Sequence, residues 1–221
     1  MESGQPRSAR QRARAAVAAL AVLYPASCAL HHSDPLQLLV ATILSAQTTD
    51  ERVNAVTPRL FQRCRTASDY ASIEPAELEE IIHSTGFFRA KARSLIGMGR
   101  VLAEEFGGEV PNSMEQLLRL PGVGRKTANV VLGVGFGVPG FPVDTHVTRL
   151  TNRLGIVRTK DPVRIEREVC RMVPRSEWTD FSLRLIAHGR AVCLARGPRC
   201  QLCPMASWCP SAVVGAVRAS A

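Results

Sequence analysis

The stretch Leu-Pro-Gly-Val-Gly-Arg-Lys-Thr-Ala at residues 120–128 decides the fold of this chain. Pro121 cannot continue a helix, and Gly122 and Gly124 let the backbone turn tightly after it. A second helix then begins, and its free N–H groups and partial positive charge attract a phosphate. Nothing in this turn can read a base edge, so it would position a nucleic-acid backbone without selecting a sequence. The alternative is a plain glycine turn between two short helices, which a bare Gly-x-Gly pattern does not exclude.

The residues on both sides of this turn follow helical spacing. Apolar side chains at positions 36, 39, 40, 43 and 44 fall on one face of a helix, and Asp34 and Pro35 before them are start signals. No segment sustains a period of two, so the sequence predicts an all-α fold. The Gly- and Pro-rich stretch 133–142 is the best candidate for a domain boundary. We expect helices over 15–23, 36–44, 50–65, around 78–82, around 95–106, over 113–120, around 128–131, over 161–173 and around 183–187.

The bulk composition limits the partners that the chain can have. Its 221 residues allow one large domain or two small ones. A net charge of +9 favours a polyanionic partner, although a solvated basic surface would give the same number. Aromatic residues make up 5% of the chain, which argues against stacking platforms for single strands. The apolar stretches are too short for a membrane span and no clean signal cleavage site follows the N-terminal run, so a cytoplasmic protein is expected.

Four of the seven cysteines fall within 17 residues near the C-terminal end of the chain. An odd total with one tight group predicts a metal site and not a secreted disulfide framework. Four thiolates hold either zinc or a [4Fe–4S] cluster, and spacing alone does not decide between them. The clustered residues are Cys193, Cys200, Cys203 and Cys209, whereas Cys28, Cys64 and Cys170 are scattered and expected in the core.

Two further positions carry chemistry that has a simpler structural alternative. Lys126 follows the glycine turn directly, where the dipole of the helix start helps to make a lysine nucleophilic, or where the lysine simply contacts phosphate. The segment Val-Asp-Thr-His-Val at 143–147 lies downstream. Taken alone, Asp144 is best interpreted as the N-cap of the following helix, and His146 as a core residue.

Together these motifs resemble the endonuclease III family of the helix–hairpin–helix DNA glycosylase superfamily. Residues 120–128 match the superfamily's hairpin almost letter for letter. The hairpin lysine followed by Val-Asp-Thr-His at 143–146 resembles endonuclease III specifically. The x6-x2-x5 spacing of the four cysteines after residues 188–190 is similar to the family's cluster signature, which favours [4Fe–4S] over zinc. The resemblance covers residues 15–210.

The resemblance implies the domain organisation. Residues 29–139 would form a barrel of about six helices that carries the hairpin. Residues 140–221 would form the iron–sulfur cluster domain, with the N-terminal helix, in residues 1–28, packed against it.

The resemblance also implies the reaction. Lys126 would attack the sugar carbon that bears an oxidised pyrimidine, release the base and hold the strand as a Schiff base. Elimination would then break the strand on the 3′ side, which is an AP lyase reaction. Asp144 would help to deprotonate Lys126 and stabilise positive charge on the sugar. The expected partner is double-stranded DNA that contains damaged pyrimidines or abasic sites, bound by a monomer in the cytoplasm and nucleoid of a bacterial-type cell.

Residues that contact DNA can be assigned from the same resemblance. The loop at 44–50 would place Gln47 in the space that a flipped base vacates, and the Gly-Phe-Phe-Arg-Ala-Lys-Ala stretch at 86–92 would place Phe87 as a wedge. Without the family, a polar helix terminus and a buried phenylalanine pair are the simpler interpretations. Phe87 and Leu118 depart from the family's usual residues; the larger ring of Phe87 leaves the opposite-base preference open, and both departures also fit a weakly active paralogue. The other expected DNA contacts are Gly122, Gly124, Arg125, Thr127, His146, Arg196 and Arg199.

Two alternatives remain. A monofunctional glycosylase would release a base without cutting the strand. A helix–hairpin–helix DNA-binding iron–sulfur protein, or a weakly active paralogue, would bind DNA without efficient catalysis.

Overall fold

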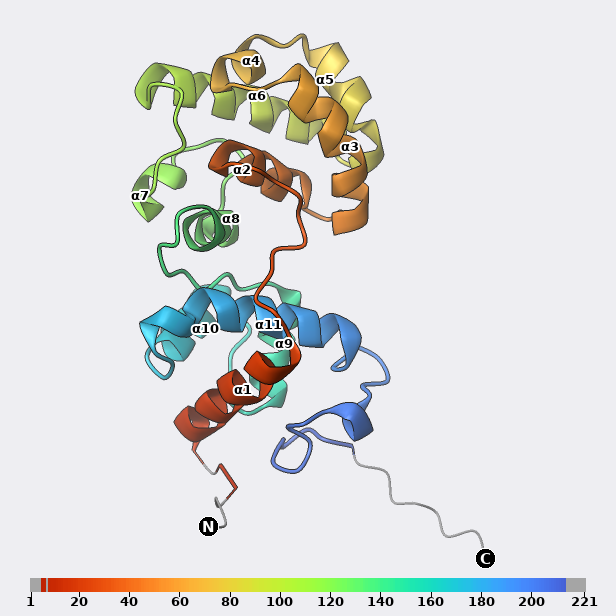
Figure 1. Ribbon diagram of the computed structural model, residues 1–221, viewed down its shortest axis with the longest axis vertical. Coiled ribbons are helices and arrows are strands. Elements are labelled where there is room, and N and C mark those ends of the chain that lie inside the picture. Colours follow the sequence, from red (N-terminus) through yellow and green to blue (C-terminus); the bar gives the residue numbers. More distant parts are fainter. Residues whose placement is uncertain (1–4, 7, 214–221) are drawn as a thin grey trace, which may run out of the picture. The chain divides into compact units, whose positions relative to one another are not determined.

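The structure is a computed structural model that describes residues 5, 6 and 8–213, and every regular element in this part of the chain is helical (Figure 1). The all-α prediction is therefore confirmed. Residues 1–4, 7 and 214–221 lie outside the described residues. They belong to the expected N-terminal helix segment (1–28) and to the expected cluster domain (140–221). The α-helices are α1 Ala9–Leu23, α2 Pro35–Leu44, α3 Asp50–Arg63, α4 Ala67–Ser72, α5 Pro75–Ile82, α6 Phe88–Glu105, α7 Met114–Leu117, α8 Arg125–Val130, α9 Thr145–Arg153, α10 Pro162–Cys170 and α11 Trp178–Ala191. Shorter 3₁₀ turns cover His83–Thr85, Arg175–Glu177 and Cys200–Leu202, and a π-helical turn covers Val131–Gly135.

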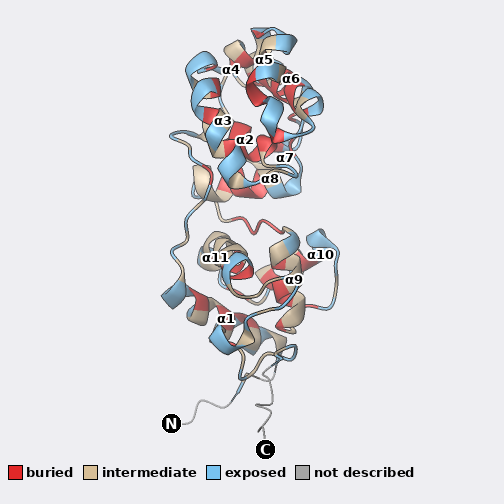
Figure 2. Cartoon of the chain, turned by 90° about the vertical axis from the view of Figure 1, so that its right-hand side faces the viewer, coloured by how far each residue is buried: buried red, intermediate tan, exposed pale blue. Residues whose placement is uncertain are grey.

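The chain forms two compact units. One unit is residues 28–140, and the other joins the residues before 28 to those from 141 onward. The passage from one unit to the other at Gly140 and Phe141 falls within the Gly- and Pro-rich stretch 133–142. In each unit the buried residues gather on the inward faces of the helices (Figure 2).

The unit 28–140 is built around α2, in which every residue from 38 to 44 is buried. Asp34 caps this helix by accepting from the Gln37 N–H at 2.8 Å, and Pro35 occupies its first turn, as the sequence signals predicted. Apolar faces of α3, α5 and α6 complete the core. The buried position of α2 fixes both of its ends. The C-terminal end of α2 leads directly into the turn that carries Gln47.

Helix α4 was not predicted from the sequence. It begins with a capping box in which Thr66 and Asp69 exchange side-chain and backbone bonds. It packs closely on α6 because Gly99 has no side chain: a Cβ there would lie 2.7 Å from the Ala67 carbonyl oxygen. The six-residue length of α4 leaves too few turns for helical periodicity to appear in the sequence.

The second unit packs α1 against α11, and α11 against α9. Small and apolar residues of α1 face inward, with Ala13, Ala16 and Leu20 fully buried. Helix α1 starts at Ala9, earlier than residue 15, because Ser8 and Gln11 form a capping box in the basic segment. None of the helices in the described part of the chain combines the length and apolar character that crossing a membrane requires.

Candidate nucleic-acid and catalytic site

Buried apolar side chains anchor the hairpin turn between α7 and α8 to the core. Leu120 is 2% exposed and Val123 is 8% exposed, and the Val123 N–H donates to the Leu120 carbonyl at 3.1 Å. Gly122 has a φ of +80°, and a Cβ at this position would lie 2.7 Å from the Ser94 Cβ. Only glycine meets both conditions, so the turn is fixed by backbone conformation and by its fit on α6.

The start of α8 presents backbone amides to solvent. Gly124 is the N-cap residue, and no side chain caps this helix. A Cβ on Gly124 would meet nothing within 4 Å, so the space in front of the helix start is open. Helix α7 ends at Leu117, three residues earlier than predicted, and the turn is correspondingly longer. An uncapped helix start with an open approach is the arrangement that binds a phosphate.

The side chains that follow the turn point away from the core. Arg125 and Lys126 are exposed, and Thr127 is half-buried. Lys126 therefore stands beside the amides of α8 in water. Within this unit, Lys126 differs from an ordinary surface lysine because it lies beside the positive end of the short helix α8.

Gln47 and Phe87 share an unusual backbone conformation. Their φ angles are +54° and +49°, and among the described residues they are the two non-glycine residues with positive φ. Gln47 is exposed in the turn between α2 and α3, and the Phe87 side chain is 67% exposed at the start of α6. A left-handed conformation is unfavourable for such residues and indicates a functional constraint. Phe88, in contrast, is half-buried and packs on His83 with ring centroids 4.5 Å apart, so the predicted phenylalanine pair divides into one exposed and one packed ring.

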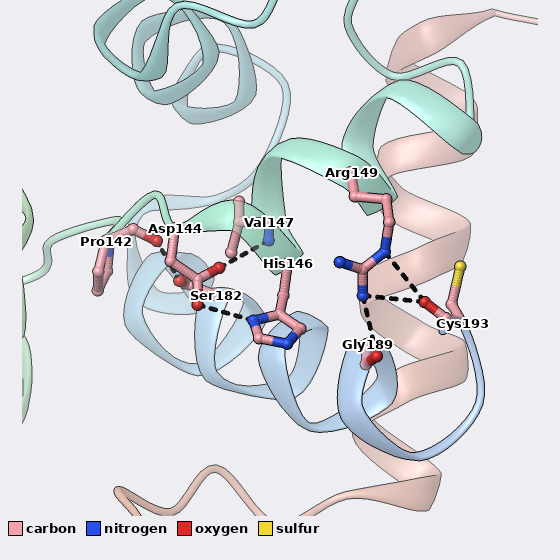
Figure 3. A network of polar contacts seen from close by, with 8 residues as sticks. All are labelled: Pro142, Asp144, His146, Val147, Arg149, Ser182, Gly189 and Cys193. Atoms are coloured by element: carbon pink, nitrogen blue, oxygen red, sulfur yellow. Dashed lines mark hydrogen bonds and ion pairs between the residues drawn. The ribbon is translucent and has the colours of Figure 1, made fainter. Parts of the chain in front are cut away.

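Asp144 caps helix α9, which confirms the N-cap interpretation. Its Oδ1 accepts from the Val147 N–H at 2.8 Å, and its Oδ2 lies 3.0 Å from Nδ1 of His146 (Figure 3). The side chains of Asp144 and His146 are 14% and 26% exposed. Both carboxylate oxygens are thus oriented, and the exposed edge of the group stays accessible to a ligand.

Helix α11 fixes the segment that carries Asp144. The Ser182 hydroxyl donates to the Pro142 carbonyl at 2.5 Å, just before Asp144 (Figure 3). Gly189 allows α9 to approach closely, because a Cβ there would lie 3.0 Å from atoms of His146. Arg149 of α9 donates to the Gly189 carbonyl at 2.9 Å and also to the carbonyl of Cys193. The helix that positions Asp144 is therefore tied directly to the first clustered cysteine.

The four clustered cysteines line one pocket of about 30 Å³ whose walls are otherwise largely apolar. Burial raises the pKa of the Cys203 and Cys209 thiols, so a positive group is needed to keep them as thiolates. Among the described residues, no three His, Cys, Asp or Glu side chains converge on the spacing of a single metal ion. Four thiols around one pocket are the donor set of either a zinc site or a [4Fe–4S] cluster.

Nitrogen donors approach the sulfur atoms of this pocket. Arg153 Nη1 lies 3.4 Å from Cys193 Sγ, and His188 Nε2 lies 3.4 Å from Cys203 Sγ. His188 is fully buried, burial lowers its pKa to about 4, and its Nδ1 lies 3.0 Å from the Tyr24 hydroxyl. With that hydroxyl donating to Nδ1, Nε2 carries the proton and faces sulfur. N–H donors to sulfur are a usual means of stabilising cluster thiolates.

The loop between the first two clustered cysteines presents two arginines. Arg196 and Arg199 are exposed, as the sequence analysis expected for phosphate contacts. Arg153 donates to the carbonyls of Leu194 and Ala195 at 2.7 and 2.9 Å, which fixes the backbone of this loop. The loop therefore combines a fixed backbone with cationic side chains in solvent.

Comparisons with known proteins show which family the chain belongs to. Residues 40–175 match the HhH-GPD superfamily of base excision DNA repair proteins. The endonuclease III of Synechocystis sp. (strain ATCC 27184 / PCC 6803 / Kazusa) is 56% identical over 207 residues, which are 93% of this chain and 94% of that protein. The chain belongs to the endonuclease III family. Solved structures agree: a non-covalent endonuclease III–DNA complex and a trapped covalent endonuclease III–DNA intermediate both give a TM-score of 0.88, at 42% and 43% identity, covering 92% of this chain and 96% of theirs.

Membership of the endonuclease III family gives the activity. The chain is a base excision repair DNA glycosylase with AP lyase activity, and it binds DNA. The resemblance and the helix–hairpin–helix fold class stated from the sequence are both confirmed. The roles of individual residues are a separate question.

Two kinds of supporting residue in this chain were not predicted from its sequence. Arg149 and Arg153 hold the cysteine loop through its carbonyls, and an arginine gives no sign in the sequence of which carbonyl it will reach. Lys91 is 5% exposed, although it lies in the stretch 86–92 that was quoted for Phe87. Lysine is rarely buried, so its place within a quoted motif was the one available signal.

Proposed function

We propose that Lys126 is the nucleophile of a bifunctional reaction on oxidised pyrimidines and abasic sites in duplex DNA. The observation that supports it is local: an exposed lysine follows an uncapped helix start in an otherwise fixed turn. Phosphate bound at those amides brings the sugar of the neighbouring nucleotide close to the lysine amine. The chain has two other lysines, Lys91, which is buried, and Lys160, which lies outside the hairpin.

The reaction proceeds by exchange of bonds at the sugar C1′. The Nζ–C1′ bond forms as the C1′–N bond breaks, and the base leaves with that electron pair and then takes up a proton. The C1′–O4′ bond then breaks, O4′ takes up the proton that Asp144 received from the lysine, and the nitrogen lone pair forms a protonated Schiff base, which acidifies the C2′ proton. Loss of that proton breaks the C3′–O bond and expels the 3′ phosphate, and water finally hydrolyses the imine and returns the lysine. Asp144 accepts the lysine proton and stabilises the positive charge that develops on the sugar.

The remaining predicted residues have binding roles in this proposal. The amides at Gly122 and Gly124, with Arg125 and Thr127, hold the phosphate, and His146 contacts the backbone or the flipped nucleotide. Gln47 fills the space that the base leaves, and Phe87 parts the opposite strand. The exposure of Gln47 and Phe87 supports these two roles.

The four cysteines, Cys193, Cys200, Cys203 and Cys209, hold a [4Fe–4S] cluster in this proposal. Bound there, the cluster supplies a rigid anchor for the loop that presents Arg196 and Arg199 to phosphate, and the reaction itself takes no electron from it. Residues 29–139 act as the hairpin-bearing barrel domain, and residues 140–221 with the N-terminal helix act as the cluster domain. The protein works as a monomer on nucleoid DNA in the cytoplasm of a bacterium. Its net charge of +9 supports the DNA partner, and its bacterial relatives support the bacterial setting.

Borohydride trapping tests the nucleophile. A duplex with one thymine glycol is incubated with wild type, Lys126→Gln or the matched control Lys160→Gln, and covalent adducts are counted by gel. Wild type and Lys160→Gln should form adducts, whereas Lys126→Gln should form them roughly 10³-fold more slowly. Equal trapping by Lys126→Gln would overturn the assignment, and base release without any adduct would favour a monofunctional glycosylase.

A further inference from the structure

Lys91 is a buried lysine whose three bonds all go to neutral oxygens. Its Nζ donates to the Leu44 carbonyl at 2.7 Å, to the Thr48 hydroxyl at 2.7 Å and to the Thr85 carbonyl at 2.8 Å. An ammonium has three donors, so its hydrogen-bonding capacity is filled. No ion pair involving Lys91 is found in the part of the chain that the structure describes.

Burial of this ammonium is unfavourable by itself. Burial lowers the pKa of Lys91 to about 8, which reflects the cost of moving the charge out of water without a counter-charge. An apolar residue at this position of α6 would avoid that cost, because the surrounding core is apolar. The positions of the three hydrogen-bond acceptors of Lys91 indicate its role.

The three partners belong to the two turns that carry Gln47 and Phe87. Leu44 and Thr48 flank the turn of Gln47, and Thr85 lies two residues before Phe87. The Thr48 hydroxyl also donates to the Thr85 carbonyl, so the two turns are joined both directly and through the lysine. Lys91 comes from the first turn of α6, where its own N–H donates to the Phe87 carbonyl at 3.1 Å.

Both turns hold a residue in an unfavourable conformation. Gln47 and Phe87 have positive φ, and such conformations persist only where the surrounding structure maintains them. The bonds of Lys91, together with the Thr48 hydroxyl bond to Thr85, reach both turns at once. We propose that Lys91 is a positioning residue that clamps the two turns, so that Gln47 and Phe87 enter the duplex as one rigid pair. This inference rests on the roles proposed above for those two residues.

The clamp predicts a selective defect. Lys91 is buried and its three donors are already used within the protein, so its loss should leave phosphate-dominated binding intact. Opening of the duplex should suffer, because displacement of an inserting side chain by about 1 Å can cost about 10²-fold in rate. A lysine needed only for folding would lower stability without changing what the folded protein does to DNA.

The test uses a duplex in which 2-aminopurine stands opposite a tetrahydrofuran abasic analogue that cannot be cleaved. Its fluorescence at saturating protein reports unstacking of the opposite base, and anisotropy gives the dissociation constant for undamaged duplex. Lys91→Met should lose most of the fluorescence rise while keeping the undamaged-DNA affinity. The control Arg59→Met removes a surface cation that pairs with Glu80 and should behave like wild type.

The outcomes separate the clamp from the proposed function. A wild type with no fluorescence rise contradicts the roles given to Gln47 and Phe87. A wild-type rise that Lys91→Met reproduces in full overturns the clamp alone. If Lys91→Met shows no cooperative thermal melt, Thr48→Val decides, because it removes the shared hydroxyl and retains the lysine. A reduced rise with Thr48→Val supports the clamp, and a full rise contradicts it.

Discussion

At the scale of single residues, Asp144 has an observed role as the cap of α9 and a proposed role as the catalytic partner of Lys126. One of its oxygens caps α9 at the Val147 N–H, while the other faces His146. The sequence left the N-cap and the catalytic partner as alternatives, and the geometry is compatible with both. The two roles can be separated, because an asparagine caps a helix as well as an aspartate does but is neither a base nor an anion.

Asp144→Asn and Asp144→Ala should therefore differ in stability but not in chemistry. The asparagine variant retains the cap and should melt close to wild type, whereas the alanine variant should lose about 0.5–2 kcal/mol of stability. Both should release thymine glycol slowly. Thermal melting and single-turnover base release measure the two effects, and an asparagine variant with wild-type turnover would show that Asp144 only caps.

At the scale of elements, the hairpin depends on two glycines for different reasons. Gly122 needs a positive φ and a close approach to Ser94, while Gly124 has an ordinary φ of −97° and open space in front of it. One glycine is thus required by the fold and the other keeps the helix start accessible. The sequence pattern contains both without distinguishing them.

Alanine substitutions at Gly122 and Gly124 should separate an effect on folding stability from an effect on DNA binding. Gly122→Ala should cost about 1–3 kcal/mol of stability because of strain and contact with Ser94. Gly124→Ala should cost about 0.5–1 kcal/mol of stability, because alanine is a poorer N-cap residue than glycine, and should weaken binding to undamaged duplex by about 1.5–3 kcal/mol, because a methyl group obstructs the phosphate site. Urea denaturation and anisotropy titration measure these quantities, and wild-type affinity in Gly124→Ala would place the phosphate elsewhere.

The sequence predicted most elements because their signals are local. Capping residues, helical spacing and breakers identified α2, α3 and α10, and the cysteine spacing identified the pocket. Helix α4 was missed because its six residues are too few to show helical periodicity, and because its packing on Gly99 involves residues far apart in sequence. The burial of Lys91 was missed for the same reason, since its partners lie on two other segments. Contacts of this kind follow from the tertiary fold and have no period along the chain.

At the scale of the whole molecule, the cysteine pocket holds together a unit built from both ends of the chain. Tyr24, just after α1, meets His188 of α11, and His188 meets Cys203. Arg149 and Arg153 of α9 bind the loop that contains Cys193. The pocket is therefore connected to the N-terminal helix as well as to the helix that positions Asp144.

Loss of the proposed [4Fe–4S] cluster should loosen this unit and spare the other one. Cys203→Ser should lose the visible absorbance of an iron–sulfur protein, and its amides in α1, α9 and α11 should exchange with solvent faster. Amides of α2 and α6, in the unit 28–140, should keep wild-type protection because that core is separate. Hydrogen exchange followed by mass spectrometry measures both, and equal loss of protection in the two units would contradict a local structural role.

The most direct test of the mechanism is to find the residue that becomes attached to DNA. Wild-type protein is trapped with borohydride on a thymine glycol duplex, the DNA is digested, and peptide mass spectrometry locates the sugar remnant. Its presence on Lys126 would identify the hairpin lysine as the nucleophile. A remnant on Lys160, on Lys91 or on the N-terminal amine, with Lys126 unmodified, would contradict the account.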